Sequence, residues 1–129
     1  KKELPKTYKE CCEVLGIDHN LYLDLNHGDI SGEYKPNVYT QNVVYLFNKL
    51  YMVLICRDAY WKLADDWSFK IGGNSQEVVH GITIWGTGIM KDLYHKLNCN
   101  LIFVFPTEEM RDAFYENFRD LINECKELL

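Results

Sequence analysis

The longest uninterrupted helix of this chain is expected in residues 37–64, which read NVYTQNVVYLFNKLYMVLICRDAYWKLA. The segment has no internal glycine or proline, and Pro36-Asn37 or Thr40 supplies residue types that begin helices. At about 100° per residue, one wide apolar stripe collects Val43, Leu46, Phe47, Leu50, Val53, Leu54, Tyr60, Trp61 and Ala64. Arg57 falls near the centre of this stripe. We therefore predict a long helix over about residues 40–64.

Two more helices are expected, one near each end of the chain. Thr7 and Glu10 form a capping box, in which the threonine accepts a helix N–H and Glu10 reaches back to the N–H of Thr7. Gly16 is a natural end for this short helix. The last helix is predicted over about residues 107–128, with Thr107 as its cap. Its apolar stripe contains Met110, Ala113, Phe114, Phe118, Leu121, Ile122, Cys125 and Leu128.

Four segments have the patterns of strands. Residues 21–26 alternate strictly between apolar and polar side chains. Residues 67–71 alternate in the same way, and the β-branched segment 78–85 follows after turn residues, so these two are predicted to form a hairpin. Residues 100–105 are apolar on both faces, which suits an interior strand. The segment 91–97 is compatible with either a short helix or a loop.

The order of these elements predicts the fold class. A helix, a strand, a long helix, a hairpin, a strand and a helix do not repeat a βαβ unit, so we expect an α+β fold. The predicted sheet is antiparallel or mixed, has about four strands, and is covered by the helices at 40–64 and 107–128. A length of 129 residues suits one domain over 1–129.

Composition and charge argue against several classes of protein. A formal net charge of −5 and 14 scattered basic residues argue against binding to duplex nucleic acid. The longest apolar runs fall well short of the roughly 20 residues that span a bilayer, so no membrane segment is expected. The five cysteines are an odd number and lack any C-x-x-C pair, which favours free core thiols in a reducing compartment.

Arg57 is the first candidate for a special role. A guanidinium on an apolar face needs a carboxylate partner or access to water. We predict a structural ion pair, with Asp65 or Glu124 as the partner; the alternative is an arginine kept for an anionic ligand. The similar segment around Arg111 is not interpreted as a repeat, because Arg111 lies at the rim of its own stripe.

Tryptophans and aspartates near residues 61–67 suggest a binding surface. Trp61 and Trp67, joined by Trp85 through the hairpin, would make an aromatic platform that stacks sugars or bases. Asp65 and Asp66 would accept hydrogen bonds from hydroxyl groups. The competing interpretation is that these rings close the core at the helix end.

Other motifs give weaker signals. The Gly86-Thr87-Gly88 turn after a predicted strand, with a possible helix behind it, resembles the layout that cradles phosphate, although an ordinary turn also explains it. The segment beginning at Asp24 resembles a calcium loop, but Lys35 stands where a glutamate is required. No histidine lies at a telling distance from Cys56. We therefore predict no metal, no cofactor and no catalytic residue.

Two segments, LPKTYKECC at 4–12 and FPTEEMRDAFYENF at 105–118, together with RDAY at 57–60 and Trp67, resemble a loosely defined family of small uncharacterised proteins from gut-bacterial bacteriophages and prophage-like elements. The resemblance implies a phage-related protein, in the cytoplasm or in the phage particle, that binds or assembles rather than catalyses. We expect a non-catalytic module for a protein or glycan partner. The alternative is a small nucleotide-binding or enzymatic accessory protein that uses the Gly86-Thr87-Gly88 turn.

Overall fold

A computed structural model describes residues 3–19, 37–68, 78–85, 88–95 and 103–128. Its elements follow the order α1 (Tyr8–Leu15), α2 (Val38–Leu63), β1 (Val78–Trp85), β2 (Gly88–His95), β3 (Phe103–Phe105), α3 (Glu108–Cys125) and the short 3-10 turn η3 (Lys126–Leu128). The strands form one antiparallel sheet in the order β2-β1-β3. The predicted α+β class is confirmed. The strand expected at 21–26 lies outside the described residues, so a fourth strand stays a prediction.

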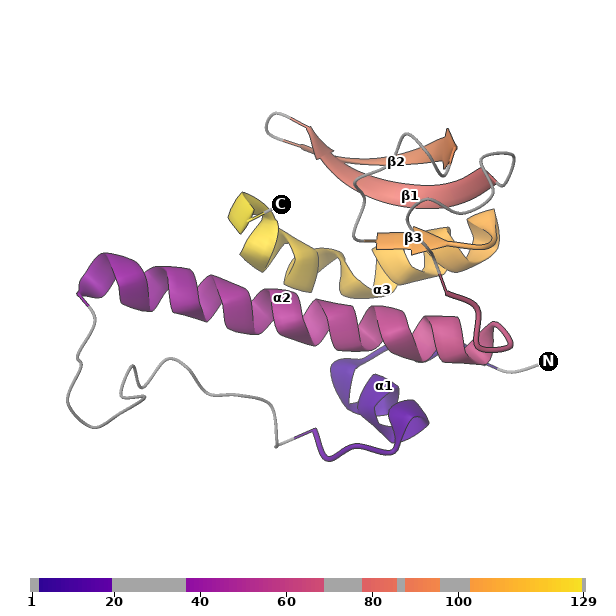
Figure 1. The fold of residues 1–129 in the computed structure, drawn as a ribbon, viewed down its shortest axis with the longest axis horizontal. Coiled ribbons are helices and arrows are strands. Elements are labelled where there is room, and N and C mark those ends of the chain that lie inside the picture. Colours follow the sequence, from indigo (N-terminus) through magenta and orange to yellow (C-terminus); the bar gives the residue numbers. More distant parts are fainter. Residues whose placement is uncertain (1–2, 20–36, 69–77, 86–87, 96–102, 129) are drawn as a thin grey trace.

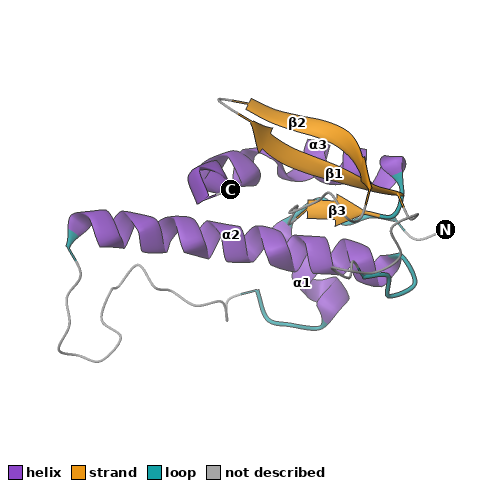
Figure 2. Ribbon diagram, turned by 45° about the horizontal axis from the view of Figure 1, so that its top comes forward, coloured by secondary structure: helices purple, strands orange, loops and turns teal. Residues whose placement is uncertain are grey.

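Helix α2 runs through the middle of the molecule. Figure 1 shows α1 on one side of α2, and α3 with the sheet on the other. Figure 2 shows the same order after a 45° turn. Helix α3 packs against β1 and β3, and α2 contacts α1, α3 and β3. None of the helices described is both long and apolar enough to cross a bilayer.

The ends of the helices follow local sequence signals. Thr7 and Thr107 accept hydrogen bonds from the N–H groups of Glu10 and Met110, both at 3.1 Å. Asn37 caps α2 by accepting from the N–H of Thr40 at 2.8 Å. One detail of the capping box was wrong: the Glu10 carboxylate accepts from the N–H of Lys6, at 2.7 Å, and not from that of Thr7.

Helix α2 keeps the predicted stripe only in part: Val53 and Tyr60 are fully buried, and Leu50, Leu54 and Trp61 pack against the core. Its core face contains Val53, Cys56, Ala59 and Tyr60, all fully buried, whereas Arg57 is half-buried one residue, or about 100°, away. Apolar side chains surround this helix because it packs between α1 and α3. A helix that is apolar all round has no single stripe from which the sequence can choose the buried face. Its first half leaves Phe47 half-exposed, although the stripe placed that ring in the core.

The sheet differs from the prediction in its pairing. β1 keeps the predicted bounds, but its hairpin partner is β2, at 88–95, which overlaps the segment 91–97 where a short helix or a loop was expected. Trp85 pairs with Gly88, so a two-residue connection joins β1 to β2. In the predicted partner, 67–71, Trp67 and Ser68 are not strand, and 69–71 lie outside the described residues. β3 lies at the edge of the described sheet, but all three of its residues are buried.

Tyr60 is the centre of the core. Its ring makes edge-on contacts with Phe105, Phe114 and Phe118, with centroids 5.1–6.1 Å apart. The hydroxyl donates to the carbonyl of Pro5 at 2.8 Å and accepts from Nδ2 of Asn117 at 3.2 Å. One residue of α2 therefore ties together the segment before α1, β3 and α3. Burial raises the pKa of Tyr60 to about 12.

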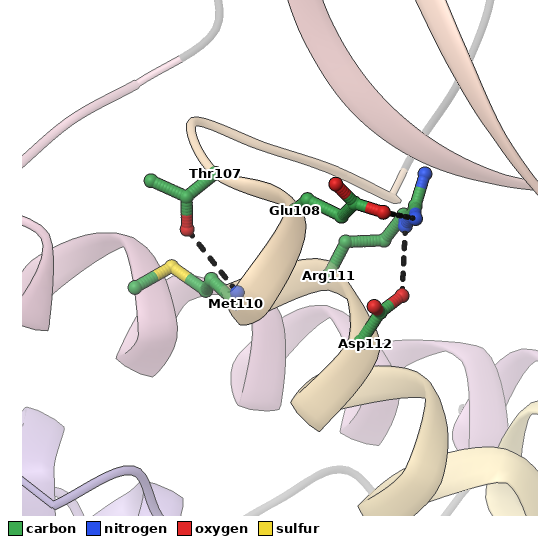
Figure 3. A network of polar contacts seen from close by, with 5 residues as sticks. All are labelled: Thr107, Glu108, Met110, Arg111 and Asp112. Carbon is green, nitrogen blue, oxygen red and sulfur yellow. Dashed lines mark hydrogen bonds and ion pairs between the residues drawn. The ribbon is translucent and has the colours of Figure 1, made fainter.

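The two arginines have exchanged their expected environments. Arg111, predicted at the rim, is buried at 8% exposure, while Arg57 is the more accessible of the two. Figure 3 shows the Arg111 guanidinium between the carboxylates of Glu108 and Asp112, at 3.4 and 3.1 Å. These two carboxylates neutralise a charge that would be costly to bury alone.

Candidate functional site

The candidate site forms where α2 ends and the chain reverses. Asp65 and Asp66 both adopt the left-handed conformation, with φ of 57° and 59°. This conformation is uncommon for residues other than glycine, although aspartate tolerates it better than most. The N–H of Asp66 bonds to the carbonyl of Lys62, and that of Trp67 to the carbonyl of Ala64. The reversal brings Trp67 back against the last turns of the helix.

The two tryptophans meet at a right angle. Their ring centroids lie 5.2 Å apart with an interplanar angle of 88°, so the edge of one indole faces the ring of the other. The Trp61 indole N–H donates to the carbonyl of Val104, in β3, at 2.7 Å. Both rings pack on the buried side chains of Val79 and Val104. On this inner side, the tryptophans close the core against the sheet.

Arg57 lies over the ring of Trp61, with its central carbon 4.2 Å from the ring centroid. Its Nε and Nη2 donate to Oδ1 of Asp58 at 3.2 and 2.9 Å. Arg57 thus forms an ion pair with the neighbouring Asp58, whereas the predicted partner Glu124 pairs with Lys49 at 3.4 Å. A guanidinium stacked on an indole and bonded to a carboxylate combines two favourable interactions.

A shallow pocket of about 350 Å³ opens on the outer side of this corner. It is lined by Leu15, Asp58, Trp61, Lys62, Asp66 and Trp67. We call it the tryptophan corner. Among the residues described, the Asp66 carboxylate makes no hydrogen bond or ion pair. The pocket also borders the C-terminal end of α2, where the helix dipole adds partial negative charge.

The structure brings together some of the predicted site residues but not all. Trp61, Trp67 and Asp66 line the corner, and Asp65 lies exposed beside it. The backbone of Trp85 is six residues further along β1 than Val79, about 20 Å at the usual rise of a strand. Trp85 is the last residue of β1, so its backbone lies at the opposite end of the strand from Val79, on which Trp61 and Trp67 pack.

The layout expected around Gly86-Thr87-Gly88 changes as well. Residues 86 and 87 lie outside the described residues, and Gly88 begins strand β2 rather than a helix. A phosphate cradle of the expected kind needs the N-terminus of a helix at this position. The calcium-like segment from Asp24 to Lys35 also lies outside the described residues.

The thiols of the described residues are poorly placed for nucleophilic chemistry. Cys11, Cys12, Cys56 and Cys125 are free and fully buried. The neighbouring Cys11 and burial raise the pKa of Cys56 well above its usual range, and burial raises that of Cys125 to about 11. No group of three or more histidine, cysteine or acidic side chains suited to a metal occurs in the described part of the chain.

Sequence reasoning missed three contributors to the corner. Leu15 comes from the end of α1, and the Val104 carbonyl comes from a strand 43 residues away from Trp61. No local sequence pattern predicts that Leu15 or the Val104 carbonyl lies at the corner, because both positions depend on tertiary packing. Asp58 was within reach of the sequence, since Arg57 and Asp58 precede Trp61 by four and three residues and therefore lie one turn from it on the same helix.

Comparison of the chain with protein-family models, with curated proteins and with solved structures found no match. The functional argument therefore depends on the geometry of the site itself.

Proposed function

We propose that this chain is a non-catalytic interaction module of a phage or prophage-like element, and that it recognises a protein or glycan partner through the tryptophan corner. The observation that carries the proposal is the outer pocket between Trp61 and Trp67, which combines aromatic rings with the carboxylate of Asp66. Aromatic rings beside a few polar groups are typical of recognition sites. The phage context is supported by the resemblance of residues 4–12 and 105–118 to small proteins of gut-bacterial bacteriophages and prophage-like elements.

The absence of a catalytic role is supported by the state of the potential nucleophiles. Thiols react as thiolates; the neighbouring Cys11 and burial raise the pKa of Cys56, and burial raises that of Cys125, which favours the protonated form of both. Free thiols also support a location in the cytoplasm or in a phage particle exposed to a reducing compartment. Gly88 begins a strand, so the part of this turn that the structure describes lacks the helix N-terminus on which the nucleotide-binding alternative depends.

The proposal is tested by measuring the binding of the full chain to arrays of defined peptides and glycans. Trp67→Leu removes an aromatic wall of the corner, and Phe47→Leu removes a half-exposed ring elsewhere, on the first half of α2. Thermal unfolding establishes beforehand that both variants are folded. We expect reproducible binding that is lost in Trp67→Leu and retained in Phe47→Leu. The opposite pattern, or binding insensitive to both changes, would exclude the corner as the recognition surface.

A further inference from the structure

We infer that the tryptophan corner binds the guanidinium group of an arginine on a protein partner; this inference rests on the proposed function and narrows its ligand class. The first support is charge. Asp66 and Asp58 both line the pocket; Asp58 is bonded to Arg57, so the carboxylate left for a cation is that of Asp66, and the C-terminal end of α2 adds partial negative charge. The chain as a whole carries a formal charge of −5, which favours the approach of a basic partner.

The second support is the shape of the aromatic surface. A sugar stacks on an open, flat ring face, but the Arg57 guanidinium already lies over Trp61 at 4.2 Å. The two indoles stand at 88° to one another and make a corner instead of a platform. Cation–π recognition needs the face of an aromatic ring, because the edge carries partial positive charge, and Trp67 supplies the second indole of the corner. The geometry therefore favours a cation over a glycan.

The third support is that the molecule already holds one guanidinium in this way. Arg57 stacks on Trp61 and is bonded to Asp58. On the other side of the corner, Trp67 and Asp66 offer the same two groups, an indole and a carboxylate. Lys62 is the one cation among the lining residues; it is exposed, and its charge opposes the binding of another cation. Removing that charge should strengthen binding.

The test is an NMR titration of the isotope-labelled full chain, following the tryptophan indole signals. The probe is N-acetylarginine methylamide at millimolar concentrations, and the citrulline analogue is its uncharged isostere. Asp66→Asn is the decisive variant, because asparagine also tolerates the left-handed conformation and only the charge is lost. Asp120→Asn removes an equal charge from an exposed site on α3.

We expect saturable shifts of the Trp67 indole signal with the arginine probe and none with citrulline. Asp66→Asn should weaken the affinity about three- to fivefold, the scale of one exposed ion pair, and Asp120→Asn should leave it unchanged. Lys62→Gln should tighten binding about twofold. Equal shifts with both probes, equal affinities of the two aspartate variants, or no saturable shift would each overturn the inference.

A neutral oligosaccharide, maltotriose, separates this inference from the broader proposal. If maltotriose shifts the Trp67 signal and the arginine probe does not, the cation inference fails and a glycan-binding module remains. If array binding depends on Trp67 but not on Asp66, the corner is a recognition surface for another chemistry. If array binding is insensitive to Trp67, the proposed function itself fails.

Discussion

Replacing Tyr60 with phenylalanine should destabilise the fold sharply, although it removes a single oxygen atom. The phenylalanine ring can keep the edge-on contacts with Phe105, Phe114 and Phe118. The lost hydroxyl leaves the carbonyl of Pro5 and the amide of Asn117 without their partner. A buried polar group deprived of its hydrogen bond costs about 1–3 kcal/mol. Because Asn117 is only half-buried and can turn to water, we expect a total loss of about 2–3 kcal/mol.

This loss can be converted into a shift of the unfolding temperature. A chain of 129 residues has an unfolding entropy of about 0.27 kcal/mol/K, so the melting temperature should fall by about 7–11 °C. Calorimetry on the wild type and the variant gives this shift directly. The matched control is Tyr39→Phe, at an exposed position on the same helix, which should change stability by less than about 0.5 kcal/mol. If both variants melt at the same temperature, Tyr60 does not connect the segment before α1 with α3.

Three further predictions concern other parts of the molecule. Trp61→Phe should lower the unfolding free energy measured in urea by about 1–2 kcal/mol, because the Val104 carbonyl loses its hydrogen-bond donor. Trp67→Phe is the control, since it leaves that hydrogen bond intact, and an equal loss in both variants would contradict a stabilising role for the bond. Folding raises the pKa of Tyr60 from 10 to about 12, so the hydroxyl loses its proton at a lower pH in the unfolded chain than in the folded one. The stability that the protonated hydroxyl contributes is therefore present below about pH 10 and is lost as the pH rises toward 12. The stability gap between wild type and Tyr60→Phe should therefore narrow over that range in denaturation curves, and a constant gap would refute the assignment. Gly16→Ala should cost about 1–2 kcal/mol in thermal unfolding, since φ is +73° and no atom lies within 4 Å of the added methyl group; Gly16→Asn should cost less, and identical losses would point to packing instead.

Local signals made the helix boundaries predictable. Thr7, Asn37 and Thr107 each place a side-chain oxygen where a free helix N–H needs an acceptor, and Gly16 accepts the left-handed conformation that ends α1. These interactions span three or four residues, so the sequence contains both partners. The strand β1 was predictable for a similar reason, because its β-branched residues favour extended backbone.

Features that depend on distant partners were not predictable. The core face of α2 depends on α1 and α3, which approach it from two sides, so the wide apolar stripe of the sequence coincided with that face only in part. The segment 88–95 becomes a strand because β1 supplies its hydrogen bonds. The same limit applied to the corner: the sequence placed Trp61 beside Trp67 correctly, but it could not foresee that Val104 takes the indole N–H.

The most direct test of the tryptophan corner is hydrogen exchange of the Trp61 indole N–H, followed by NMR in the full chain. Every functional argument above requires Trp61 to be fixed to β3 on one side while the pocket stays open on the other. We predict slow exchange of this proton and a nuclear Overhauser contact between it and the backbone of β3. Exchange as fast as that of a free indole, without any contact to β3, would contradict the corner and the binding site built on it.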